Sequence, residues 1–233
     1  MMMNPITAAR ALLPVLALCV LQACSNAPLA PDWQMEAKGA TDRAVAAYLE
    51  GNTNVETAEL SRARKALSST GRADRMANAE LRYCAARVAS LVFEPCAGFE
   101  PLRADADGAQ GAYADYLRGQ QVTASQLALL PATQRAAATR TANDAQALQG
   151  MDDPLSTLVA AGVLFETGRA NSAIIAQAVD TASSQGWRRP LLAWLGVQLQ
   201  RATLAGQTAE AARLQRQIAR VQGTATAAPQ NPN

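Results

Sequence analysis

The stretch of sequence that decides the fold covers residues 153–168 and reads DPLSTLVAAGVLFETG. Asp153 directly before Pro154 is typical of a helix start, because aspartate caps the first turn and proline is favoured at the first helical position. An apolar run follows and ends near Gly168, where a left-handed residue commonly terminates a helix. The stretch therefore predicts one apolar helix over residues 154–167.

Similar start and stop signals predict three more helices after this one. They cover residues 171–185, 190–205 and 208–222 and are joined by loops of two to four residues. Short loops force consecutive helices to run antiparallel, so we expect the four helices to form two stacked hairpins. Six glycines follow apolar runs at expected helix ends: Gly51, Gly71, Gly119, Gly168, Gly186 and Gly206.

Helix signals also fill the first half of the chain. Thr53 with Glu56, and Thr123 with Gln126, have the spacing of capping boxes. Pro131 is expected to end or restart a helix. One apolar stripe steps by four and three residues, as a buried helix face does: Ala77, Leu81, Cys84, Val88 and Leu91. Because no convincing strand accompanies these helices, the predicted fold class is all-α.

Two segments of the chain recur. Residues 44–51 match residues 112–119 at five of eight positions, and residues 67–73 match residues 164–170 at five of seven. The first pair lies 68 residues apart, twice the tetratricopeptide period of about 34 residues. The second lies 97 residues apart, which is not a multiple of that period. Region 154–222 resembles a pair of tetratricopeptide-like α-hairpins, which implies stacked antiparallel hairpins in an irregular α-solenoid. Convergent alanine-rich hairpins with similar caps are the alternative.

An apolar run near the N-terminus ends at a cysteine. Residues 11–21 are interrupted by Pro14 and are too short to span a bilayer, which takes about 20 residues. The run leads into the stretch Leu21-Gln22-Ala23-Cys24. This stretch resembles the lipobox of bacterial lipoproteins, although Gln22 departs from the small or apolar residue usual at that place.

The lipoprotein resemblance implies removal of residues 1–23 and a covalent diacylglycerol on Cys24. It also implies a periplasmic face, and Ser25 in place of aspartate implies the outer membrane rather than the inner one. Residues 24–32 are then a proline-containing tether, and residues 223–233 are expected to be a disordered tail. The alternative is an ordinary cleaved signal in which Cys24 is incidental.

Cys84 and Cys96 would remain in such a processed chain. In an oxidising compartment an even pair predicts a disulfide. A helix that ends near Val92 reaches about 12 Å beyond Cys84, and four extended residues can return about 13 Å. The bond is therefore reachable, and we expect it to stabilise the fold by about 3 kcal/mol. Two free thiols are the alternative.

The composition excludes several kinds of chemistry. None of the 233 residues is histidine, which removes Ser-His-Asp and Cys-His catalysis and histidine-ligated metal sites. A formal net charge of +2 gives no electrostatic case for nucleic acid. Carboxylates remain for a hydrolase at Asp105/Asp107 and Asp152/Asp153, but Asp153 already has a capping role. We expect no catalytic residue, no metal and no cofactor beyond the lipid.

A basic segment offers one candidate partner surface. Residues 62–87 carry seven basic and two acidic side chains. Its candidate contact residues are Arg62, Lys65, Arg75 and Arg82. The functional interpretation is a surface for an anionic partner, whereas a solvated helix face is the favoured alternative.

A second candidate surface surrounds Pro190. Trp187, Arg188, Arg189 and Trp194 are grouped there, and tryptophan and arginine are frequent interface anchors. Cations at a helix start oppose the helix dipole, which leaves room for a bound anion or a compensating carboxylate. The alternative places the tryptophans in the core.

These observations predict a membrane-anchored periplasmic lipoprotein with a helical domain over residues 33–222. Its expected task is non-catalytic, as a scaffold or adaptor for another envelope protein. A cell-wall hydrolase or activator that works with carboxylates alone is the alternative from another class. A structural link between membrane and cell wall is a third.

Overall fold

The computed structural model describes residues 31–139 and 144–223. The predictions for the signal peptide, the lipobox, most of the tether and nearly all of the C-terminal tail lie outside these residues. Among the helices that the structure describes, none is both long and apolar enough to cross a bilayer.

The described residues are all-α, as predicted, and contain no strand. The first helices are α2 (Asp32–Glu50), α3 (Thr53–Ser68), α4 (Ala73–Ala89) and α5 (Gly108–Leu117), with the 3-10 helix η2 (Glu100–Asp105) before α5. Short elements follow: α6 (Ala124–Leu129), α7 (Ala132–Ala138) and the 3-10 helix η3 (Asp144–Leu148). The last helices are α8 (Pro154–Glu166), α9 (Ser172–Ser184), α10 (Arg188–Leu204) and α11 (Thr208–Gln222).

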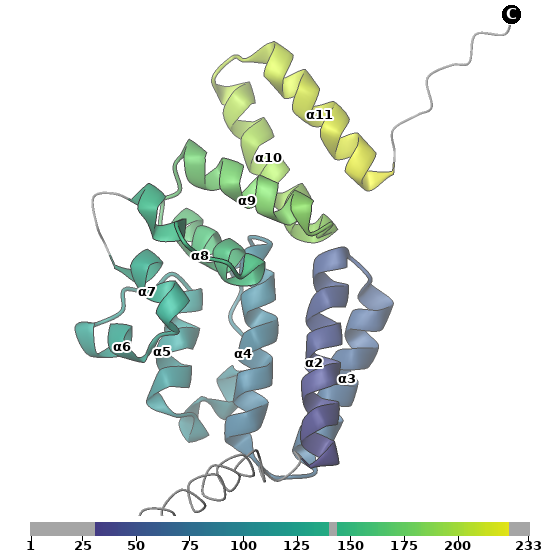
Figure 1. Cartoon of the computed structure of the whole chain (residues 1–233), viewed down its shortest axis with the longest axis vertical. Coiled ribbons are helices and arrows are strands. Elements are labelled where there is room, and N and C mark those ends of the chain that lie inside the picture. Colours follow the sequence, from purple (N-terminus) through teal and green to yellow (C-terminus); the bar gives the residue numbers. More distant parts are fainter. Residues whose placement is uncertain (1–30, 140–143, 224–233) are drawn as a thin grey trace, which may run out of the picture. The chain divides into compact units, whose positions relative to one another are not determined.

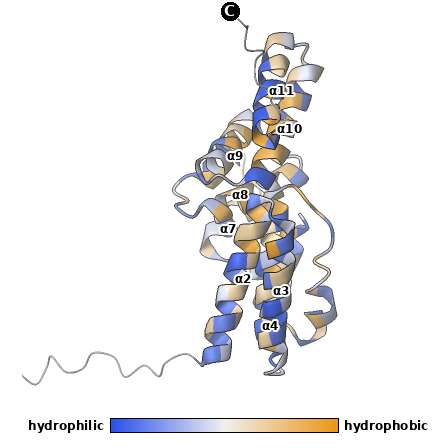
Figure 2. Cartoon of the chain, turned by 90° about the vertical axis from the view of Figure 1, so that its right-hand side faces the viewer, coloured by the Kyte–Doolittle hydropathy of each residue, from blue (hydrophilic) through white to orange (hydrophobic). Residues whose placement is uncertain are grey.

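α2 and α3 form an antiparallel hairpin, and α4 packs against α2 (Figure 1). From α8 onward, each helix packs against the next, and α10 also contacts α2. Hydrophobic and hydrophilic residues are mixed within single helices (Figure 2), as expected where each helix buries only part of its circumference. The contacts of α2 with α10, and of α4 with α8, join elements that are far apart in sequence.

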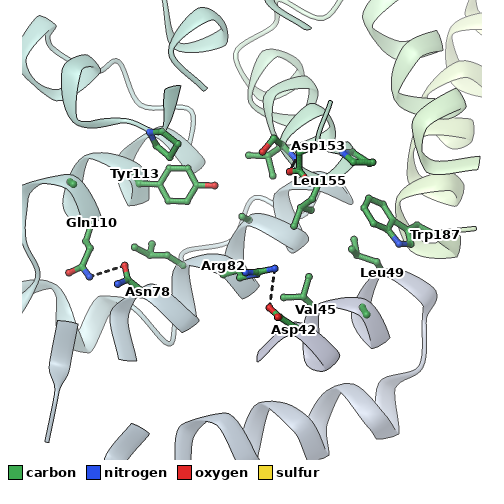
Figure 3. A pocket seen from close by; sticks show the side chains of 18 of the residues that line it. Asp42, Val45, Leu49, Asn78, Arg82, Gln110, Tyr113, Asp153, Leu155 and Trp187 are labelled. Carbon is green, nitrogen blue, oxygen red and sulfur yellow. Dashed lines mark hydrogen bonds and ion pairs between the residues drawn. The ribbon is translucent and has the colours of Figure 1, made fainter. Parts of the chain in front are cut away.

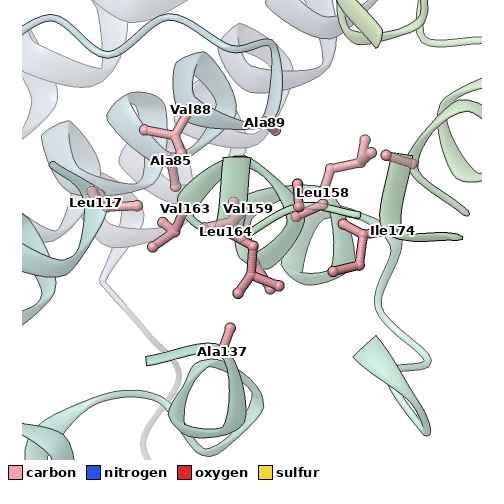
Figure 4. Packing of buried hydrophobic residues seen from close by; sticks show 14 of the residues in the cluster. Ala85, Val88, Ala89, Leu117, Ala137, Leu158, Val159, Val163, Leu164 and Ile174 are labelled. Carbon is pink, nitrogen blue, oxygen red and sulfur yellow. The ribbon is translucent and has the colours of Figure 1, made fainter. Parts of the chain in front are cut away.

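α8 is the exception, because its middle is buried on all sides. Its eight residues from Thr157 to Leu164 are all buried, and its neighbours are α4, α5, α7 and α9 (Figure 4). The close crossing of α8 with α4 requires Gly162, since a Cβ at this position would lie 2.5 Å from the Val88 carbonyl oxygen. The stretch that decides the fold therefore forms the helix around which the others pack.

The sequence located the C-terminal helices within two residues at each end. The largest difference is at α10, which begins at Arg188 because Pro190 fits the first turn of a helix, where no backbone donor is lost. All six predicted glycines have positive φ, between 64° and 84°. The caps at Thr123 and Asp153 are also confirmed, since both side chains accept a hydrogen bond from the backbone of the first turn. α7 begins directly after Pro131, as expected.

The predicted capping box at Thr53 and Glu56 is wrong. Asn52 caps α3 instead, and its side chain accepts a hydrogen bond from the Val55 N–H. The competing signal lay one residue upstream, where asparagine is as strong a cap as threonine or stronger. Glu56 is thereby free for another role, described below.

The predicted disulfide between Cys84 and Cys96 is present, with the two Cα atoms 5.6 Å apart. α4 ends at Ala89 rather than near Val92, and Leu91 turns the chain back with a φ of 60°. A left-handed residue other than glycine costs about 1–2 kcal/mol. Packing of the Leu91 side chain against the main core helps to offset this cost.

Candidate functional site

A groove with a volume of about 740 Å³ lies between α2, α4, α5 and the start of α8 (Figure 3). We call it the central groove. Its apolar lining includes Val45, Leu49, Leu81, Ala85, Leu129, Leu155, Val159 and Trp187. Its polar lining includes Asp42, Asn78, Arg82, Asp107, Gln110, Tyr113 and Asp153. The volume and the mixed lining are typical of binding pockets, which measure about 300–1,000 Å³.

Helical spacing explains how two walls of the groove arise. On α2, Asp42, Val45 and Leu49 are three and four residues apart and therefore share one face. On α4, Asn78, Arg82 and Ala85 follow the same rule. Each wall thus presents a polar residue at one end and an apolar residue at the other.

An ion pair joins the two walls. Arg82 Nη2 of α4 lies 3.0 Å from Asp42 Oδ1 of α2 (Figure 3). Lys38 Nζ donates to Asp42 Oδ2 at 2.7 Å. Asp42 therefore has cationic neighbours on two sides, and its charge is compensated within the protein.

Gln110 anchors the polar end of the groove. Its Nε2 donates to Asn78 Oδ1 at 2.9 Å and to the Asp74 carbonyl at 2.8 Å, while its Oε1 accepts from the Asp107 N–H. Gln110 is buried, and its polar atoms are all used. The side-chain nitrogen of Asn78 (Nδ2), by contrast, has no hydrogen-bond partner among the described residues.

Tyr113 points its hydroxyl into the central groove (Figure 3). The ring stacks on Tyr116 with centroids 6.1 Å apart, but in the part of the chain that the structure describes the hydroxyl makes no hydrogen bond. Burial raises the pKa of Tyr113 well above its usual value, and the nearby Asp153 carboxylate adds to the rise. The hydroxyl is therefore neutral and can donate or accept.

The carboxylates considered for catalysis have structural roles or are exposed. Asp107 caps α5 and Asp153 caps α8, each accepting a 2.8 Å hydrogen bond from a backbone N–H of the first turn. Both lie at the rim of the central groove, where each keeps one carboxylate oxygen free of hydrogen bonds from the described residues. Asp105 and Asp152 are exposed and do not line the groove.

The residues grouped around Pro190 are separated by the fold. Trp187 lines the central groove and is partly exposed. Trp194 is fully buried, packs edge-on against Phe165 and donates from Nε1 to the Ala89 carbonyl. The prediction of Trp194 as a partner contact is therefore wrong, because the side chain is buried against Phe165 of α8 and Ala89 of α4. Arg188 is exposed beside the turn between α2 and α3.

Arg189 pairs with a carboxylate, that of Glu56, which is one of the two outcomes that its position at a helix start predicted. Its Nη1 donates to Glu56 Oε2 at 2.7 Å, and its Nη2 donates to Thr53 Oγ1 at 2.8 Å. Its guanidinium also lies 4.2 Å from the centroid of the Tyr48 ring, a cation–π contact. We call this group, with Tyr83, the Glu56 clamp.

Tyr83 completes the Glu56 clamp from α4. Its hydroxyl donates to Glu56 Oε1, and its ring meets the Tyr48 ring edge-on at 5.6 Å. Burial, together with the hydrogen bond to the carboxylate, raises the pKa of Tyr83 to about 12. The Glu56 clamp thus joins α2, α3, α4 and α10. The guanidinium of Arg189 is engaged within the protein, so a partner could contact it only in competition with Glu56 and Thr53.

Most arginines of the basic segment pair with carboxylates, some of them inside the segment or on the same helix and others outside it. Arg62 pairs with Glu59, Arg75 with Asp74, and Arg82 with Asp42. Within the described residues, Lys65 has no ion pair. Counting charges along the sequence missed the Arg82–Asp42 pair because Asp42 lies on α2 and comes close only after folding. Arg75 and Arg82 do share a face, as predicted, and both line a cavity of about 240 Å³ next to the central groove.

Sequence reasoning missed the central groove as a site, although it had singled out four of its rim residues for other reasons: Arg82, Asp107, Asp153 and Trp187. The missing signals were Asp42 and Tyr113, whose significance depends on which helices meet.

No group of three or more histidine, cysteine or carboxylate residues that could hold a metal occurs among the described residues. No family model, curated protein or solved structure matches this chain.

Proposed function

We propose that this protein is a lipid-anchored adaptor of the bacterial envelope, whose helical domain holds a segment of another protein in the central groove. The observation that carries the proposal is the groove itself: four helices and Trp187 line it, and its apolar walls stand beside the Tyr113 hydroxyl, which has no hydrogen bond to the described residues. Convergent polar groups in an apolar pocket are the general mark of a binding site.

The proposed cellular location rests on the N-terminal sequence and on the disulfide. The stretch Leu21-Gln22-Ala23-Cys24 resembles a lipobox, and the disulfide between Cys84 and Cys96 fits an oxidising compartment. We propose the outer membrane, on its periplasmic face, with the lipid on Cys24. Palmitate labelling of the wild type and of Cys24→Ser tests the anchor, since only the wild type should take up label.

A non-catalytic role is supported by the structural roles of the carboxylates that were candidates for catalysis. Asp107 and Asp153 act as helix caps, so a hydrolase would depend on groups that the fold already uses. We also propose that α8 to α11 are tetratricopeptide-like hairpins, because each of these helices packs against its sequence neighbour. The contacts of α2 with α10 would make this an irregular, partly closed version of such a stack.

Photocrosslinking in living cells tests the adaptor role. A photoreactive phenylalanine derivative at Trp187 should yield a covalent adduct with an envelope protein, because this side chain lines the groove. Leu204 is the control position, since it is 81 % exposed at the end of α10 and away from the groove. The proposal fails if neither position yields a protein adduct and the protein instead sediments with purified peptidoglycan.

A further inference from the structure

The charges of the central groove are unbalanced. Three aspartates and one arginine line it, for a formal net charge of −2. Arg82 pairs with Asp42, so the excess belongs to Asp107 and Asp153. Neither of these two carboxylates has a cationic partner within the residues that the structure describes.

Apolar surface lies open beside these carboxylates. Leu129 is 48 % exposed at the rim of the groove, and Leu155 and Trp187 are partly exposed along its wall. An occupant that covered this surface would gain from removing it from water. The Tyr113 hydroxyl offers a hydrogen bond in the same space, on the side of Leu155 and Asp153, while Asn78 lies beside Gln110 at the other end of the groove (Figure 3).

We propose that the central groove binds a basic amphipathic peptide segment of a partner protein. An apolar side chain of the segment packs against Leu155 and Trp187, and lysine or arginine side chains face Asp107 and Asp153. This inference rests on the proposed adaptor function and names the chemistry of its partner. An anionic ligand, such as a phospholipid headgroup, is disfavoured because the carboxylates at the rim repel it.

Two matched double variants separate groove charge from total charge. Asp107→Asn/Asp153→Asn, the groove variant, removes both carboxylate charges and keeps both caps, because asparagine caps helices as well as aspartate does. Asp105→Asn/Asp152→Asn, the control variant, removes the same charge from exposed neighbours outside the groove. Circular dichroism melts of both variants should match the wild type.

The probe is a random dodecapeptide library displayed on phage and selected on the immobilised full chain in detergent. We expect enriched peptides to contain an apolar residue near lysine or arginine. A fluorescent synthetic copy should bind the groove variant at least tenfold more weakly by anisotropy, and should bind the control variant like the wild type. The affinity should also fall with added salt.

The inference is overturned if no peptide is enriched, if the enriched peptides are acidic, or if both double variants bind alike. It is also overturned if light scattering shows a dimer of the full chain that the groove variant abolishes, since the occupant would then be a second copy. In each case, adducts at Trp187 in cells with another envelope protein would leave the adaptor function standing.

Discussion

Two polar clusters border α4 and differ in whether the protein completes them. In the Glu56 clamp, the carboxylate receives Tyr83 and Arg189, and the guanidinium also meets Thr53 and the Tyr48 ring. In the central groove, Asp107 and Asp153 have no cationic partner among the described residues, and the Tyr113 hydroxyl has no hydrogen bond there.

The difference follows from burial. Glu56 is 8 % exposed, and an enclosed charge destabilises a fold unless partners satisfy it. Asp107 and Asp153 are exposed at the rim of the groove, where water can satisfy them until a ligand arrives. The clamp therefore serves stability, since it joins residues 133 positions apart, whereas the carboxylates of the groove are left open to the ligand that we propose.

The largest expected effect comes from breaking the Glu56 clamp. Glu56→Ala leaves Arg189 near a helix start without its carboxylate and removes the acceptor of the Tyr83 hydroxyl. We expect a loss of about 3 kcal/mol in the free energy of unfolding, as for other broken buried ion pairs. Urea denaturation measures it. Glu210→Ala breaks an exposed pair with Arg213 and should leave the urea midpoint unchanged; equal losses in the two variants would contradict the account.

The disulfide lies close to the Glu56 clamp, since Tyr83, Cys84 and Cys96 line the same cavity. Cys84→Ala/Cys96→Ala opens the loop between two cysteines that are 12 positions apart. We expect the free energy of unfolding to fall by about 3 kcal/mol, slightly less than in the clamp variant. Binding of a groove peptide, measured at a temperature where the variant is folded, should remain within twofold. A selective loss of binding would show that the groove depends on the disulfide.

Alkaline pH should weaken the clamp before it affects the groove. The pKa of Tyr83 is about 12 in the folded protein and about 10 in the unfolded chain. The stabilisation is therefore complete below pH 10 and is lost as the pH rises through 12. Urea midpoints between pH 9 and pH 12 should fall less steeply in Tyr83→Phe than in the wild type. Identical slopes would exclude Tyr83 as a source of the decline.

The smallest effect is expected in the groove. Tyr113→Phe removes a hydroxyl that has no hydrogen bond to the described residues, so the free energy of unfolding should change by less than about 0.5 kcal/mol. The same variant should weaken binding of a groove-selected peptide that uses this hydroxyl. A loss of more than about 1 kcal/mol in chemical denaturation would mean that the hydroxyl is not free.

Much of the helical frame followed from local sequence. Caps, prolines and glycines located α8 to α11, because these signals act within one or two turns of a helix. The stripe from Ala77 to Val88 likewise identified the buried face of α4. The short elements α6, α7 and η3 lacked such repeated signals, and most of their bounds could not be predicted.

The candidate sites depended on contacts that local patterns do not contain. Glu56 has the spacing of a cap, yet it binds Arg189 of α10. Arg82 resembled part of a basic surface until Asp42 of α2 compensated it. Trp194 resembled an interface anchor, but it is buried between Phe165 of α8 and Ala89 of α4. In each case, the deciding partner came from a distant helix.

The most direct test of the central claim is photocrosslinking from Leu155, on the wall of the groove, in living cells. The account predicts an adduct whose mapped peptide from the partner contains lysine or arginine beside an apolar residue. It also predicts that Asp107→Asn/Asp153→Asn removes most of this adduct while Asp105→Asn/Asp152→Asn leaves it intact. An adduct that persists at full yield in the Asp107→Asn/Asp153→Asn background, or that maps to an acidic segment, would contradict the account.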